Sequence, residues 1–152
     1  MTEDSVRIVE LEPMRVAAAL GFGSQPEIEA WDKLMTWART TNLLDGTPRF
    51  FGFNNPNPMP GSPNYGYEQW MTVGKDVEPL GDIEIKGFEG GRFAVLRCDG
   101  LATIEHDWGR LAAWLEASPH QADNRQCLEE LLNSPVLPHT EWVFDLYVAI
   151  TE

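Results

Sequence analysis

Residues 127–150 read CLEELLNSPVLPHTEWVFDLYVAI, and the end of this stretch decides the fold. Its last seven residues alternate between apolar side chains and others. The apolar positions are Phe144, Leu146, Val148 and Ile150. A period of two is typical of a β-strand with one face on a core. The stretch therefore predicts a strand whose second face carries the acid Asp145 and the aromatic ring of Tyr147.

An earlier stretch, GYEQWMTV at residues 66–73, has the same alternation, with Glu68 and Trp70 standing 77 positions before Asp145 and Tyr147. The same shift aligns further identical residues without a gap. These pairs are Ile8/Ile85, Glu12/Glu89, Arg15/Arg92, Ala17/Ala94, Gly23/Gly100, Trp31/Trp108, Leu34/Leu111, Trp37/Trp114 and Pro58/Pro135. Since Trp is rare, two aligned Trp pairs favour an internal duplication. We predict one domain, residues 1–152, made of two repeats at about 5–74 and 82–151.

Local patterns place two strands, a helix and two further strands in each repeat. Strands are expected at 6–11, 15–22, 49–54, 66–73, 83–88, 92–98, 126–132 and 144–150. Apolar residues at helical spacing predict one helix from Gln25 to Thr41 and a second that holds Ile104 to Leu115. LEELL within 126–132 would suit a helix, but its register with the first repeat favours a strand.

These elements predict an α+β fold. We expect βαββ-type units duplicated in tandem about a pseudo-twofold axis, in which an antiparallel sheet carries both helices on one face. A ligand groove is expected at the seam between the repeats. The helical tryptophans Trp31, Trp37, Trp108 and Trp114 are expected to pack between helix and sheet.

Composition narrows the classes of function. The chain carries a net charge of −13 and only three lysines, which disfavours direct nucleic-acid binding. No apolar run reaches the length of a membrane span, and the N-terminus lacks a signal peptide pattern, so we expect a cytoplasmic protein away from membranes. Cys98 and Cys127 have no zinc or disulfide spacing and are expected to be buried reduced thiols. No cofactor or metal is predicted.

The second face of the predicted strands suggests a binding site. Glu68 and Trp70 share that face with Asp145 and Tyr147, and Glu129 lies on the strand before them. A carboxylate in an aromatic groove loses hydration, and a bound organic cation would favour its charged form. Each aromatic face would add cation–π attraction of about 0.5–2 kcal/mol. We interpret these five residues as ligand-binding.

Several separated motifs resemble the GyrI-like effector-binding domain family, which includes ligand-binding domains of some AraC-type and MerR-type multidrug-responsive regulators. They are RFFGFNNPNPMPGSPNYGYEQWMTV (49–73), EGGRFAVLRCDG (89–100), QCLEELLNSP (126–135) and FDLYVAI (144–150). The resemblance implies tandem βαββ-like units around a pocket for hydrophobic, frequently cationic, small molecules. It also implies that Glu129 is the pocket acid, since LEELLNSP matches the family pattern F-E-x-Y-x-N-x-P. Leu128 and Leu131 replace the aromatic residues of that pattern.

The leading hypothesis is a stand-alone binder of lipophilic, cationic small molecules that acts as a sensor or sequestering protein. One alternative is a small hydrolase of cyclopropane-type toxins that uses Glu129. A second is a gyrase-type enzyme inhibitor, and exposed edge strands permit a protein partner or a homodimer. Purely structural readings also remain open: Glu68 and Asp145 as ion-pair partners of Arg15 or Arg92, and Glu129 as an exposed strand acid.

Overall fold

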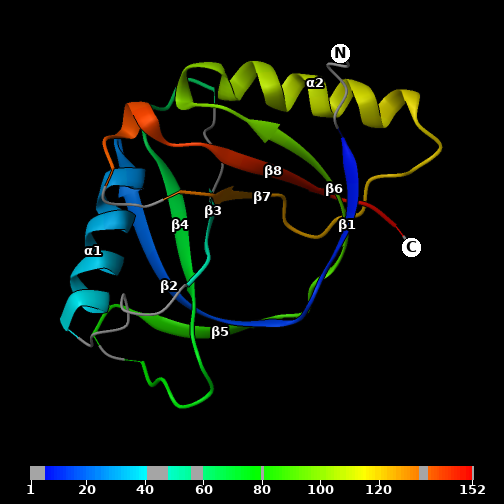
Figure 1. Ribbon diagram of the computed structural model, residues 1–152. Helices are drawn as coiled ribbons and strands as arrows, with labels where there is room; N and C mark the ends of the chain where they lie inside the picture. The colour runs from blue at the N-terminus through cyan, green and yellow to red at the C-terminus, as the bar shows by residue number, and fades with distance from the viewer. Residues whose placement is uncertain (1–5, 41–47, 56–59, 80, 134–136, 152) are drawn as a thin grey trace. The chain divides into compact units, whose positions relative to one another are not determined.

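The computed structural model describes residues 6–40, 48–55, 60–79, 81–133 and 137–151. Within these residues the chain is α+β, with every strand pair antiparallel (Figure 1). The strands are β1 (Arg7–Leu11), β2 (Met14–Gly23), β3 (Phe50–Asn54), β4 (Tyr65–Thr72), β5 (Glu84–Phe88), β6 (Gly91–Cys98), β7 (Leu128–Leu131) and β8 (Phe144–Ala149). The helices are α1 (Pro26–Thr40) and α2 (Ile104–Ala117), with short 3-10 turns at Leu101–Thr103 and His139–Glu141. Neither α1 nor α2 is long and apolar enough to cross a membrane.

Each predicted strand and both predicted helices are present, with ends that differ by one or two residues for most elements. The segment around LEELL forms strand β7 rather than a helix, as its register with the first repeat predicted. Pro58 and Pro135, one of the identical pairs, lie outside the described residues.

One compact unit spans Pro13–Glu89, and its strands follow the order β5-β2-β4-β3. Helix α1 packs on β2 and β4 and buries Ala30, Leu34, Trp37 and Ala38. Acids in its first turn and Arg39 in its last turn complement the helix dipole. The approach is tightest at Gly21, where a Cβ atom would lie 2.2 Å from the carbonyl oxygen of Pro26.

The second unit contains the chain up to Glu12 and from Gly90 onward, with the strand order β1-β6-β8-β7. Helix α2 packs on β6. Arg125 ties together the start of β6 and the end of the chain, because its guanidinium donates hydrogen bonds to the carbonyl oxygens of Gly90, Arg92 and Ile150. Asp123 also accepts a hydrogen bond from Arg125 at 2.7 Å, so this guanidinium connects four acceptors.

Each sequence repeat contributes its first strand to the compact unit that is built mainly from the other repeat. Strand β1 precedes β2 in the chain but pairs with β6, and β5 precedes β6 but pairs with β2. The pairing registers match. Arg7 is paired with Val95, and the residues related to these two by the 77-residue shift, Glu84 and Ala18, are paired with each other. Equivalent strands therefore make equivalent pairs in both units, although the units are not continuous in sequence.

The predicted packing of the helical tryptophans is confirmed most fully for Trp37, which is 5% exposed. Trp31 is half-buried, with its ring centroid 5.5 Å from that of Phe50. On α2, Trp114 is also half-buried and stacks against His120 at 5.8 Å. Helix α2 thus buries fewer of its side chains than α1 does.

We predict that Gly21→Ala lowers the free energy of unfolding by about 1–3 kcal/mol, because the new methyl group meets helix backbone that cannot move without separating α1 from the strands. Urea unfolding followed by circular dichroism measures the loss. Gly87→Ala is the matched control, since a Cβ atom there meets nothing within 4 Å. Equal stability of the two variants would contradict the tight contact.

Candidate functional site

Glu68 and Trp70 lie on the face of their unit that α1 does not cover. Gly21, which touches α1, is paired with Tyr67, so the side of β4 that carries Tyr67 faces the helix. Neighbouring residues of a strand point to opposite faces, which places Glu68 and Trp70 on the other side. We call this side the Glu68 face. It carries Phe51, Phe53, Glu68, Trp70, Lys86 and Phe88.

Three aromatic rings surround the centre of the Glu68 face. The ring centroid of Trp70 lies 5.1 Å from that of Phe53, in an edge-to-face arrangement, and 5.3 Å from that of Phe88. Trp70 is 6% exposed and Phe53 is 9% exposed. The face is therefore apolar and aromatic around a single buried acid.

That acid, Glu68, is 3% exposed and accepts three hydrogen bonds. Its Oε1 accepts from the Asn55 amide at 2.9 Å, and its Oε2 accepts from the Trp70 indole and the Lys86 ammonium, both at 2.7 Å. Desolvation raises the pKa of Glu68, but the hydrogen bonds from Lys86, Trp70 and Asn55 and the positive charge of Lys86 together lower it further than desolvation raises it. The resulting pKa lies below the ordinary value, so Glu68 is ionised at neutral pH.

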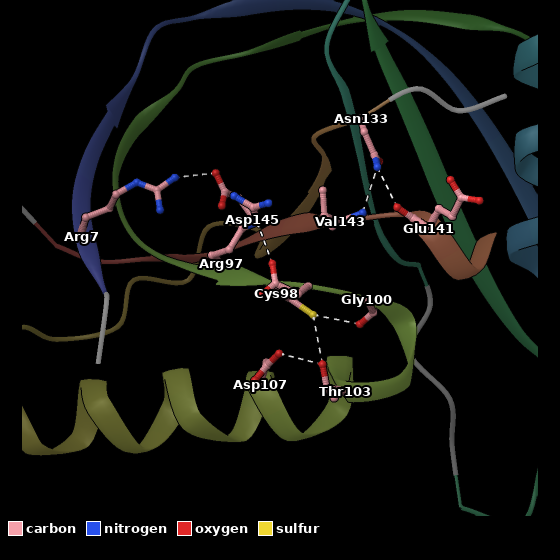
Figure 2. A network of polar contacts seen from close by, with 11 residues as sticks. Arg7, Arg97, Cys98, Gly100, Thr103, Asp107, Asn133, Glu141, Val143 and Asp145 are labelled. Carbon is pink, nitrogen blue, oxygen red and sulfur yellow. Dashed lines mark hydrogen bonds and ion pairs between the residues drawn. The ribbon is translucent and has the colours of Figure 1, made fainter. Parts of the chain in front are cut away.

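The other unit has a related face, built around Asp145 and Tyr147. Asp145 is 5% exposed, and its Oδ2 accepts a hydrogen bond from Arg7 on β1; Figure 2 shows the two side chains pointing toward each other. Its Oδ1 is buried and has no hydrogen-bond partner among the described residues. The hydroxyl of Tyr147 donates to Glu130 at 2.6 Å. We call this side the Asp145 face.

The register corrects the predicted position of Glu129. Glu129 is paired with Leu146, on the side of β8 opposite to Asp145, whereas Glu130 is paired with Asp145 itself. The carboxylate of Glu129 accepts a hydrogen bond from the indole of Trp108 on α2 at 3.0 Å. Glu130 is the strand acid on the Asp145 face and was missed from sequence. The 77-residue shift, which aligns Glu130 with Phe53, is the signal that could have identified it.

The ion-pair partners also differ from the predicted ones. Glu68 pairs with Lys86 and Asp145 pairs with Arg7. The predicted partner Arg15 donates instead to the carbonyl oxygens of Gly74 and Val77, and Arg92 pairs with the carboxylate of Glu10 at 2.9 Å. Lys86 and Arg7 were missed because both come from strands that pair outside their own half.

The Glu68 face is not acidic in balance, although the chain as a whole carries a net charge of −13. Its two acids are Glu68 and Glu84, and Lys86 lies within 2.7 and 3.9 Å of them. Arg49 adds a second positive charge, stacked over the ring of Phe51 at 5.0 Å. The excess negative charge of the protein therefore lies elsewhere on the chain.

A separate polar network beneath the Asp145 face involves Cys98 (Figure 2). The buried Cys98 thiol donates to the carbonyl oxygen of Gly100 at 3.1 Å, and Thr103 donates to Asp107 at 3.1 Å. Burial raises the pKa of the Cys98 thiol, and the nearby Asp107 raises it further. The thiol is therefore protonated at neutral pH and serves packing, as the sequence predicted.

Known proteins provide an independent comparison. No curated protein matches the chain. Among solved structures, a hydrolase from Listeria innocua superposes with a TM-score of 0.72 at 13% identity, covering 99% of this chain and 94% of that one. The C-terminal domain of EcmrR gives 0.74 at 12% identity, over 97% and 98%. SAV2435 bound to tetraphenylphosphonium gives 0.62 at 6% identity, over 97% and 94%. At these identities the likeness concerns the fold.

The sequence of the chain was also compared with models of protein families. The model of the GyrI-like small molecule binding domain matches residues 4–151, nearly the whole chain. This match agrees with the α+β architecture and with the motifs that suggested the resemblance. The chain belongs to the GyrI-like small molecule binding domain family.

Proposed function

We propose that the chain binds a lipophilic small molecule on the Glu68 face. The observation that carries the proposal is the buried carboxylate of Glu68, which accepts three hydrogen bonds beside the rings of Trp70, Phe53 and Phe88. Apolar surfaces with a few oriented polar groups are typical of small-molecule sites. Family membership supports a small-molecule role, and SAV2435, which shares the fold, was solved with a lipophilic cation.

The Asp145 face is proposed as a second contact surface for small molecules. Tyr147 packs edge-to-face on Phe93 at 5.7 Å and is 3% exposed. The buried Oδ1 of Asp145 is able to accept a hydrogen bond from a donor on a ligand. Glu129 lies on the opposite side of this sheet and is not included in the proposed site.

We further propose that the two halves are tandem repeats that each bind through the same positions. Support comes from the shared pairing register and from the equivalence of Glu68 with Asp145 and of Trp70 with Tyr147. In both halves, the acid and the aromatic residue point to one side of the fourth strand.

A hydrolytic role for Glu68, as distinct from the Glu129 of the sequence-based alternative, has weaker support from the geometry. A general acid or base works best when its pKa lies near the working pH. The pKa of Glu68 is lowered, away from neutrality, by Lys86 and by two other donors. Glu68 therefore holds no proton to donate at neutral pH, and three donors already occupy acceptor positions of its carboxylate. Binding is the function that this environment favours.

We expect the protein to bind triphenylphosphine oxide, an uncharged triaryl probe, with micromolar affinity in equilibrium dialysis. Trp70→Leu should weaken binding about two- to tenfold, because a lost aromatic contact is worth about 0.5–1.5 kcal/mol. The matched control is Trp114→Leu, which removes a tryptophan of the other unit that stacks on His120. Glu129→Gln should change the affinity less than about twofold. Equal losses for both Trp variants, or a large loss for Glu129→Gln, would place the site elsewhere.

We also predict how stability depends on pH. Because the pKa of Glu68 is lower in the folded protein than the usual 4.5, its contribution is complete above pH 4.5 and is lost as the pH falls below that value. Glu68→Gln should therefore lower the free energy of unfolding by about 1–3 kcal/mol at pH 7. The gap to wild type should narrow at pH 3.5.

Urea unfolding at both pH values measures this gap. Glu84→Gln is the control, since its side chain is 74% exposed and 3.9 Å from the same lysine. It should leave the urea midpoint unchanged at either pH. A gap between Glu68→Gln and wild type that stays constant from pH 7 to pH 3.5 would contradict the assigned charge state.

A further inference from the structure

The acid on the Glu68 face already holds a cation that belongs to the chain. Lys86 Nζ lies 2.7 Å from Glu68 Oε2, and the two side chains are 40% and 4% exposed. The carboxylate also accepts hydrogen bonds from the amide of Asn55 and from the indole of Trp70. A ligand that arrives at this face therefore meets a neutralised ion pair rather than a free negative charge.

An organic cation would have to displace Lys86 in order to pair with Glu68. The ammonium is attached to β5, which holds it beside the carboxylate at a high effective concentration. An uncharged aromatic ligand has no such competitor, because it contacts the rings of Trp70, Phe53 and Phe88 without disturbing the ion pair. Binding of a cation to Glu68 therefore requires breaking the Lys86–Glu68 ion pair, whereas binding of a neutral ligand does not.

The Asp145 face repeats this arrangement with different residues. Arg7 pairs with Asp145, and the exposed fractions of the two side chains are 50% and 7%. Arg7 lies on β1 and Lys86 on β5, the two strands that pair outside their own half. In each unit, then, the exchanged strand supplies a half-exposed cation to the buried acid of the fourth strand. Because both faces have such an ion pair, neutralisation of the buried acid by a cation of the chain is a shared feature of the two faces.

We propose that Lys86 determines ligand charge by acting as a tethered counter-ion, so that the wild-type face selects uncharged aromatic molecules over organic cations. This inference rests on the proposed function. It differs from the sequence-based expectation of a cationic ligand for this face, because that expectation assumed an acid whose charge only a ligand could balance. Glu68 then serves to hold Trp70 and Asn55 in place rather than to attract a cation.

The test compares two probes that share phenyl groups on phosphorus and differ in charge: triphenylphosphine oxide, which is neutral, and tetraphenylphosphonium, which is a cation. Isothermal titration calorimetry measures both affinities. Wild type should bind the neutral probe at least tenfold more tightly. Lys86→Gln frees the carboxylate, so it should bind the cation at least tenfold more tightly than wild type does, with less than a threefold change for the neutral probe.

Three variants isolate the cause. Lys86→Arg keeps the positive charge and should keep the wild-type preference. Lys75→Gln removes another of the three lysines, an exposed one, and should change neither affinity. The double variant Lys86→Gln with Glu68→Gln should lose the gain for the cation, because the freed carboxylate is gone. Lys86→Met, which keeps the apolar stem, replaces Lys86→Gln if circular dichroism shows that the latter is unfolded.

The outcomes distinguish a failure of small-molecule binding from a failure of the role assigned to Lys86. If neither probe binds any folded variant, the proposed function falls and the inference falls with it. If wild type binds both probes equally and Lys86→Gln leaves that ratio unchanged, small-molecule binding stands and the role of Lys86 is overturned. A gain for the cation that persists in the double variant would also overturn it, since the gain would then not come from Glu68.

Discussion

A carboxylate buried in a sheet face needs a counter-charge, and the pair of Glu68 with Lys86 supplies one from within the chain. This pair depends on topology, because Lys86 comes within reach only where β5 lies beside β2. Asp145 relies in the same way on Arg7 of β1. Exchange of the first strands is therefore more than a feature of connectivity. It brings to each face the cation that pairs with the buried acid beside aromatic rings.

The local part of the fold was open to prediction from sequence. Alternation in residues 66–73 and 144–150 identified strands β4 and β8 and showed which side chains share a face, because a strand has a fixed period of two. Helical spacing identified α1 and α2. The 77-residue register even favoured a strand over a helix for β7, where local propensity pointed the other way. Each of these inferences uses residues that are close together or repeated.

The predictions of the ion-pair partners and of the position of Glu129 were wrong, because they depend on contacts between residues that are distant in the sequence. Nothing in the order of the strands shows that β1 pairs with β6, so the cations Arg7 and Lys86 could not be assigned to their acids. The strand Leu128–Leu131 reads LEEL, which places one acid and one leucine on each side whichever way it is turned. A shift of one residue exchanges the faces, and the apolar pattern cannot detect it. Glu129 was chosen over Glu130 because LEELLNSP matches the family pattern, and the apolar pattern offered no test of that choice.

Neither the net charge nor the family motifs show which charges lie on one face of the sheet, so neither is enough to infer the charge of a ligand. A net charge of −13 describes the whole surface, whereas the Glu68 face pairs its acids with Lys86 and Arg49. The motifs that mark the family cover residues 49–73, 89–100, 126–135 and 144–150, and they include neither Arg7 nor Lys86. Two chains with the same motifs are therefore free to carry different charges on the first strand of each half. Since those strands supply the counter-ions, the charge of each face depends on residues that these motifs do not contain.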